Sequence, residues 1–374
     1  MLLLDKENVV TDSARKIVIL SERENIQTYV AQLLRTRGLE RIEIIDKDFL
    51  TDDKITFTVE ETVGVIADIQ NESDVAILSE RVNAIVPQNI WCCLIGTCDS
   101  ISIAQKLLNK SILYFNTDSQ LIQMAEKIIS AGVNIPQIRN TIKICVLGCK
   151  GGIGASFISS HIASNIVATK KVPILLAQGC NGSQDLDLLF DKKVQGDIVE
   201  YESNLHLFKG EPLSLDSTLS EKYNFIVYDQ PIFNVHPEQF SGFFEYSHNF
   251  VLVVERRISS LRVAKQFLEQ CERIRNTTGK SIRTFICVSD TSLEISKLMA
   301  KSDIESLLGC PVDAVIPFLK KTESRNILSV NLKRIGQKEM HTLVMKVLGT
   351  ISRVSFRSNK NKSLLSSIIH SLTK

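Results

Sequence analysis

A glycine-rich turn between an apolar run and a helix-forming stretch constrains this chain more than any other feature. The run 144–148 is typical of a buried strand, the segment 149–154 contains three glycines, and Ser156 lies at the start of the next helix. Glycine lets backbone N–H groups converge on an anion, and the N-terminus of the following helix adds partial positive charge. The sequence therefore predicts a strand, a phosphate-binding loop and a helix, which together belong to an α/β domain.

The positive charge of this loop lies in an unusual position. Phosphate loops of the common type place a lysine directly before the hydroxyl residue, where it contacts the phosphates. Here Ala155 occupies that position, and Lys150 is the only lysine or arginine in the segment 149–156. The displaced lysine narrows the set of proteins that this loop can resemble.

Composition limits the class of protein. A chain of 374 residues with 44% hydrophobic and 23% charged residues is long enough for two folded domains. The net charge of +2 is too small to indicate a nucleic-acid partner. No apolar run predicts a membrane-spanning helix, and the first residues become acidic too early for a signal peptide. The nine cysteines include no C-x-x-C pair, so we expect free thiols in a cytoplasmic protein rather than disulfides or a metal cluster.

Residues 1–135 alternate short apolar runs with segments of helical spacing. This alternation predicts a doubly wound parallel sheet with helices on both faces. Gly132 and Pro136 interrupt the pattern and predict a linker. The predicted strands, each followed by a helix, are 17–20, 42–45, 63–66, 92–95 and 112–115.

Residues 136–352 repeat the theme as a second doubly wound α/β domain. Ligands of such sheets bind at the carboxyl ends of the strands, where the glycine loop lies. The predicted strands are 143–148, 172–177, 204–208, 225–228, 250–254, 283–288 and 312–316, and the predicted helices are 157–169, 237–246, 260–275 and 295–308. A basic, serine-rich tail covers residues 353–374.

The loop resembles the deviant Walker A motif of the MinD/ParA ATPases, in which a signature lysine stands early in the loop, as Lys150 does. Alanine at position 155 is similar to the TadZ/CpaE branch, whose members assemble tight-adherence (Flp, type IVb) pili. That branch carries a receiver-like domain before its ATPase domain, so the resemblance covers nearly the whole chain. It implies a receiver-like (flavodoxin-like) domain followed by a P-loop NTPase of the MinD/ParA type.

The resemblance also implies a nucleotide site for ATP and Mg²⁺. Ser156 and Asp229 would hold the metal, and Lys150 would reach the nucleotide of the partner subunit in a face-to-face dimer. Ser289 stands at the position of a base-contacting asparagine, and Arg262 matches a switch-helix arginine or is simply a solvated helix charge. The implied nucleotide-binding residues are Lys150, Gly151, Gly152, Ile153, Gly154, Ala155, Ser156, Phe157, Asp229 and Pro317.

One departure from the family pattern concerns hydrolysis. Where the family has a D-x-D pair that positions the attacking water, this chain has Gln178-Gly179-Cys180. We interpret Asp185 and Asp187 as capping or flanking residues of a short helix at 186–190. Losing one charged phosphate contact costs about 1.5–3 kcal/mol, which binding at cellular ATP concentrations survives. We therefore expect ATP binding with weak or no hydrolysis.

The first domain lacks most of a receiver's phosphorylation site. Ser21 and Glu22 stand where an acidic pair is needed, Asp68 is at the acceptor position, and Asn116 follows the last strand in place of a lysine. Phosphoryl transfer needs a magnesium site made of several carboxylates. We interpret the domain as a receiver fold kept for contacts, and Asp68 as a turn residue.

The tail carries leucine and isoleucine at helical spacing from Leu364 to Leu372, behind a basic run that begins at Arg353. Such a stripe either contacts a membrane surface or packs on the ATPase domain or a partner.

These features together predict a homodimeric scaffold and localisation factor for pilus assembly. Its expected partners are pilus and secretion assembly proteins, including a secretion ATPase, and its expected location is the cytoplasm, the inner-membrane surface or the cell pole. The alternative is a ParA-like DNA-partitioning ATPase. A metabolic phosphotransferase would need the missing lysine and aspartate, and a nitrogenase-type reductase would need a bridging cysteine pair.

Overall fold

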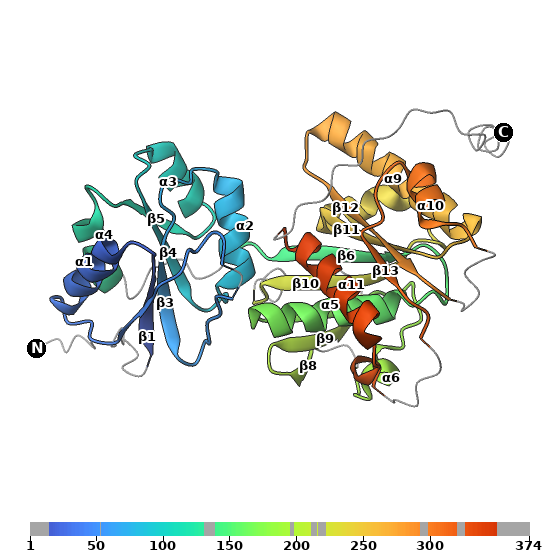
Figure 1. Cartoon of the computed structure of the whole chain (residues 1–374), viewed down its shortest axis with the longest axis horizontal. Coiled ribbons are helices and arrows are strands. Elements are labelled where there is room, and N and C mark those ends of the chain that lie inside the picture. The colour runs from blue at the N-terminus through green and yellow to red at the C-terminus, as the bar shows by residue number, and fades with distance from the viewer. Residues whose placement is uncertain are drawn as a thin grey trace, which may run out of the picture.

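The computed structural model describes residues 15–52, 54–130, 139–194, 198–210, 215, 222–291, 298–319 and 326–349. These residues form two α/β units that lie side by side, with α2 (Val75–Ile85) of the first unit next to the second (Figure 1). The predicted linker, the boundary at 135/136 and the tail 353–374 lie outside the described residues, so the division of the chain into domains stays a prediction at those points.

The first unit is a five-stranded parallel sheet in the order β2-β1-β3-β4-β5, the order of flavodoxin-like folds. All five predicted strands are confirmed. The prediction of a helix after β2 is wrong: in the described part of 46–61 the chain turns instead, and it buries Phe49, Ile55 and Phe57. The bounds are β1 Lys16–Leu20, α1 Glu24–Arg35, β2 Ile42–Ile45, β3 Thr62–Asp68, β4 Trp91–Gly96, α3 Ile101–Leu108, β5 Leu113–Asn116 and α4 Leu121–Ser130.

The second unit is an eight-stranded sheet in the order β13-β12-β11-β6-β10-β7-β9-β8. The seven predicted strands are confirmed and parallel, so the predicted α/β class with two doubly wound sheets holds. The edge strand β8, antiparallel to β9, was not predicted. The strands are β6 Ile142–Gly148, β7 Ile174–Gln178, β8 Val199–Glu202, β9 Leu205–Lys209, β10 Phe225–Pro231, β11 Asn249–Val254, β12 Arg283–Ser289 and β13 Ala314–Ile316.

The helices of this unit depart from prediction in three places. Residues 237–246 form a 3₁₀ segment and one α-turn rather than one helix, α10 begins at residue 301 rather than 295, and α11 was not predicted. The helical segments are α5 Ala155–Lys170, α6 Leu186–Phe190, η2 Pro237–Gly242, α8 Phe243–Tyr246, α9 Ile258–Thr278, α10 Lys301–Leu308, η4 Ile327–Ser329 and α11 Lys333–Val347.

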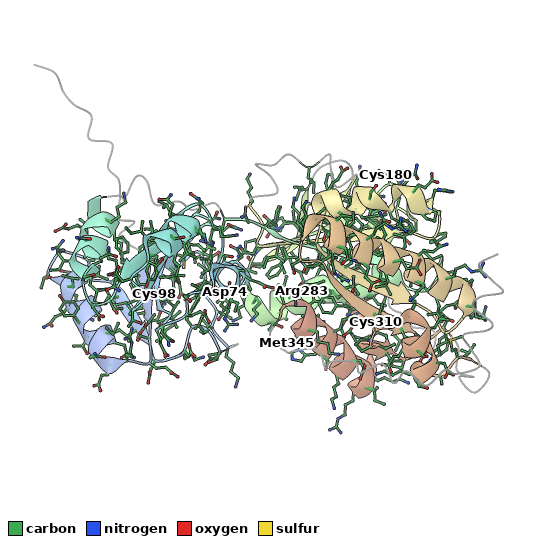
Figure 2. All side chains as sticks on the ribbon, turned by 90° about the horizontal axis from the view of Figure 1, so that it is seen from above. Asp74, Cys98, Cys180, Arg283, Cys310 and Met345 are labelled. Atoms are coloured by element: carbon green, nitrogen blue, oxygen red, sulfur yellow. The ribbon has the colours of Figure 1, made fainter. Side chains whose placement is uncertain are left out.

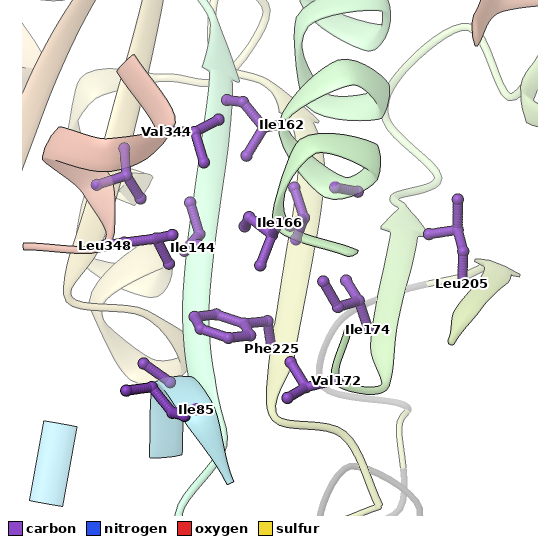
Figure 3. Close-up of a cluster of buried hydrophobic side chains, with 14 of the residues drawn as sticks. Ile85, Ile144, Ile162, Ile166, Val172, Ile174, Leu205, Phe225, Val344 and Leu348 are labelled. Carbon is purple, nitrogen blue, oxygen red and sulfur yellow. The ribbon is translucent and has the colours of Figure 1, made fainter. Parts of the chain in front are cut away.

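The apolar core continues from one unit into the other. Ile85 at the end of α2 belongs to the same buried cluster as Ile144 of β6 and Phe225 of β10, and Figure 3 shows the three side chains near one another. Each is at most 1% exposed. Burial of this extent stabilises the junction through the hydrophobic effect, so the two sheets are held as one packed body.

Buried polar groups complete the junction. The Asn224 side chain accepts from the N–H of Gln88 (3.1 Å) and donates to the carbonyls of Asn83 (2.8 Å) and Val86 (2.7 Å). The Arg139 guanidinium donates to three carbonyls after α2, and burial lowers its pKa to about 10. These groups satisfy buried carbonyls in the last turn of α2 and in the segment that follows it.

At the surface of the junction, Arg283 of β12, labelled in Figure 2, donates to Oε1 of Glu80 on α2 at 2.8 Å. This pair is partly exposed, and such pairs contribute little to stability. The buried groups therefore fix the arrangement of the two units.

Candidate phosphate-binding site

The glycine loop lies at the carboxyl edge of the second sheet, between β6 and α5. The Cys149 N–H donates to β11 at 3.0 Å, and the Gly148 carbonyl accepts at 3.0 Å from the residue after β10, so neighbouring strands fix the start of the loop. Gly152 (φ 72°) and Gly154 (φ 83°) have left-handed backbone, which other residues adopt only with strain. The loop conformation thus requires glycine at both positions.

The loop presents backbone rather than side chains to solvent. Gly151, Gly152 and Gly154 are exposed, whereas Ile153 is buried in the core. Among the described residues, no side chain caps the N-terminus of α5. Its first N–H groups and partial positive charge are therefore available to an anion.

Phe157 and Ala155, both predicted site residues, have side chains that serve packing. The Phe157 ring packs against His161 with ring centroids 4.3 Å apart and an angle of 53° between the planes, and the Ala155 methyl group lies close to Gly148. These residues can offer a ligand only their backbone N–H groups. Phe233, which is 46% exposed, covers the Gly151 side of the loop.

The Lys150 ammonium is bound within its own chain. It donates to Oε1 of Glu255, which directly follows β11 and is 3% exposed. Oε2 of the same carboxylate accepts from Thr291 at 3.1 Å. The sequence analysis missed Glu255, although its place directly after a predicted strand could have put it beside the loop. The predicted reach of Lys150 to a partner subunit requires this ion pair to open.

Ser156, Gln178 and Asp229 meet at the ends of β7 and β10. The strand register pairs Asp229 with Gln178, and Nε2 of Gln178 donates to Oδ2 of Asp229 at 3.0 Å. The same nitrogen lies 3.5 Å from Oγ of Ser156. Burial raises the pKa of the Asp229 carboxyl above its usual value, while hydrogen bonds from Ser156 and Gln178 partly offset this rise.

Asp185 also belongs to this group, which the sequence analysis did not foresee. It occupies the position before α6, as predicted, but its carboxylate accepts from Nε2 of Gln178 at 3.1 Å instead of capping the helix. Of the two predicted alternatives, Asp185 therefore flanks the helix, and its side chain does not cap it. Asp187 does lie in the first turn of α6, where it pairs with Lys209 at 3.0 Å outside the site.

The side chains of Ser156, Gln178 and Asp229, in the positions that they occupy in this structure, fit a divalent cation poorly. Ser156 and Asp229, the predicted magnesium ligands, do lie together, but an amide N–H donor points between them. Magnesium takes oxygen ligands at 2.0–2.1 Å and repels an N–H donor. The exposed glycine loop, in contrast, fits the phosphates of a nucleotide.

Three further residues matched the family pattern, namely Ser289, Pro317 and Arg262, and they differ in their distance from the glycine loop. The Ser289 hydroxyl lies 3.7 Å from where a Cβ on Gly154 would stand, so it borders the loop. Pro317 packs against Gly336 of α11. Arg262 is exposed on α9.

In the first unit, Asp68 ends β3, as expected of a turn residue, and it also forms an ion pair. Its carboxylate accepts from Ser21 (2.6 Å), from Nε and Nη2 of Arg23 (2.7 and 2.6 Å) and from the Gln70 N–H (3.0 Å). The hydrogen bond to Asp68 raises the pKa of Arg23. Both carboxylate oxygens are occupied, so a phosphoryl group would have to displace this ion pair.

The residues that the structure describes contain no cluster of three or more His, Cys, Asp or Glu side chains suited to a metal ion. None of the helices in these residues combines the length and apolar character that crossing a bilayer requires.

No protein-family model matches the chain, and no curated protein matches it. Solved structures similar to it include a ParA family ATPase from Chlorobium tepidum TLS, with 18% identity over 55% of this chain and 99% of that one, at a TM-score of 0.43. The MinC:MinD complex of Aquifex aeolicus matches with 17% identity over 58% and 99%, at 0.45. MinD with Mg-ADP from Pyrococcus horikoshii OT3 matches with 15% identity over 56% and 96%, at 0.41.

Proposed function

We propose that the glycine loop binds the phosphates of ATP and that the chain uses this binding as a scaffold rather than for fast hydrolysis. The observation that carries the proposal is the exposed backbone of Gly151, Gly152 and Gly154 at the uncapped start of α5. Backbone N–H groups and the helix dipole hold a phosphate without a lysine point charge. Because Ala155 stands where a lysine would contact the phosphates, the affinity for ATP is lower, and a millimolar concentration of ATP compensates for this lower affinity.

Slow hydrolysis follows from the group around Gln178. A water that attacks the γ-phosphate needs a carboxylate or amide that orients it. The Gln178 amide is committed, since its nitrogen donates to Asp229 and Asp185 and its oxygen accepts from the Leu186 N–H at 2.9 Å. An amide whose hydrogen-bonding groups are already occupied cannot orient the attacking water. We therefore expect turnover of ATP below the ordinary enzyme range of about 1–10³ s⁻¹.

The finer role that we propose is assembly of a tight-adherence pilus. It rests on the resemblance of the Lys150 and Ala155 pattern, and of the domain order, to the TadZ/CpaE branch. The chain would act as a homodimer that positions pilus and secretion proteins, including a secretion ATPase, in the cytoplasm or at the inner-membrane surface or cell pole.

Light scattering of the purified chain with and without a non-hydrolysable ATP analogue tests this role. We expect a dimer whose fraction rises with the nucleotide. A monomer under both conditions would count against the scaffold. Binding of DNA in a mobility-shift assay, with an affinity that falls steeply as the salt concentration rises, would instead favour the ParA-like partitioning alternative.

A further inference from the structure

The amide nitrogen of Gln178 is surrounded by oxygens of the kind that bind divalent cations. One hydroxyl and two carboxylates approach it: Oγ of Ser156 at 3.5 Å, Oδ1 of Asp185 at 3.1 Å and Oδ2 of Asp229 at 3.0 Å. These oxygens come from three separate elements, namely α5, the turn before α6 and β10. The Gln178 amide nitrogen approaches all three.

The direction of this amide is fixed by the backbone. The Leu186 N–H donates to Oε1 of Gln178 at 2.9 Å, so the oxygen faces α6 and the nitrogen must face the three oxygens. A flipped amide would place its oxygen against two carboxylates and its N–H₂ against an N–H donor. Gln178 is 2% exposed and held in register beside Asp229, so the arrangement is packed in place.

We propose that the Gln178 amide takes the place of the divalent cation, so that this site binds its nucleotide without metal and excludes Mg²⁺. This inference rests on the proposed function and names the form of ligand that the site takes, the metal-free nucleotide anion. The two amide hydrogens serve the two carboxylates, Asp185 at 3.1 Å and Asp229 at 3.0 Å, which are N···O spacings of hydrogen bonds.

The bonds of the Gln178 amide oppose the entry of a cation. A cation that entered would have to displace the amide, which would then lose its bonds to Asp185 and Asp229 in a buried place. Buried amides without partners are costly, so entry of the metal is opposed.

Isothermal titration of the wild-type chain with ATP, in magnesium buffer and in EDTA buffer, is the first test. We expect binding that is about tenfold or more tighter in the EDTA buffer, because magnesium complexes most of the ATP and leaves little of the metal-free anion that the site takes. Equal affinity in the two buffers, or tighter binding with magnesium, would overturn the inference.

Counting bound Mn²⁺ by electron paramagnetic resonance, without nucleotide, is the second test. We expect no stoichiometric ion on the wild type and one ion per chain on Gln178→Glu, whose carboxylate would replace the amide nitrogen with a third anionic ligand. Gln239→Glu on the exposed segment η2 adds the same charge elsewhere and should gain no ion. One ion on the wild type, or none on folded Gln178→Glu, would overturn the inference.

The two proposals fail separately. Absence of ATP binding in both buffers would refute the proposed function, and the manganese count would still decide the role of Gln178. If Gln178→Glu does not fold, the two wild-type measurements decide it.

Discussion

Replacing Glu255 by glutamine tests whether this carboxylate competes with a nucleotide for Lys150. The change keeps the size of the side chain and leaves an oxygen to accept from Thr291, but it removes the charge that holds the ammonium. The Lys150 side chain is 37% exposed and begins inside the loop, so a released ammonium can turn to a bound phosphate.

The magnitude follows from the geometry. A hydrogen bond to a charged group contributes about 1.5–3 kcal/mol, and solvent screening of this partly exposed lysine selects the lower end. We therefore expect Glu255→Gln to bind ATP about tenfold more tightly than the wild type.

Isothermal titration with ATP measures the difference. Glu61→Gln is the matched control, since Glu61 also pairs with a lysine, Lys16, but on the surface of the first unit. This control should leave the affinity unchanged. An unchanged or weaker affinity in folded Glu255→Gln would refute the competition between Glu255 and phosphate.

Three further changes test the junction, the core and the site. Asn224→Ala removes the partner of the Gln88 N–H and of the Asn83 carbonyl, whereas the Val86 carbonyl keeps its bond from Arg139. We expect urea denaturation to give a free energy of unfolding lower by about 3 kcal/mol; a loss under about 1 kcal/mol would contradict the assigned contacts. Burial lowers the pKa of His161 from 6.5 to about 4, so the unfolded chain binds more protons than the folded chain between these two pH values. The free energy of unfolding therefore falls as the pH drops through this range, by up to about 3 kcal/mol. His161→Gln should flatten this acid limb in denaturation at several pH values, and an unaltered slope would refute the assignment. The methyl group of Gly179→Ala would overlap the Gln230 amide, and we expect a lower melting temperature. Gly182→Ala is the control, because its methyl group would make only ordinary contacts. Equal melting temperatures of the two variants would show that Gln230 moves aside.

Local patterns predicted most of the fold. The apolar runs gave every strand of the first sheet, and the glycine loop was placed at the right strand end because strand, turn and helix are adjacent in sequence. The strand β8 was missed because its residues alternate between exposed and half-buried and form no apolar run. The helix after β2 was a false expectation, since Phe49 and Ile55 are buried from a turning segment.

The site was predicted only in part because its side chains meet through tertiary structure. The sequence identified Gln178 as a departure from the family pattern, but not that its amide joins Asp185 and Asp229. Lys150 was expected to face a partner, whereas Glu255, more than a hundred residues away, binds it in the same chain. Hydrogen-bond partners at such separations leave no periodic signal in one sequence.

Equilibrium binding of ATP combined with phosphate release, on the same preparation of the wild-type chain, tests the central claim most directly. We expect saturable binding of ATP and release of inorganic phosphate that is absent or far slower than about 1 s⁻¹. Turnover near 1 s⁻¹, in the ordinary range of enzymes, would contradict it, and so would the absence of any ATP binding.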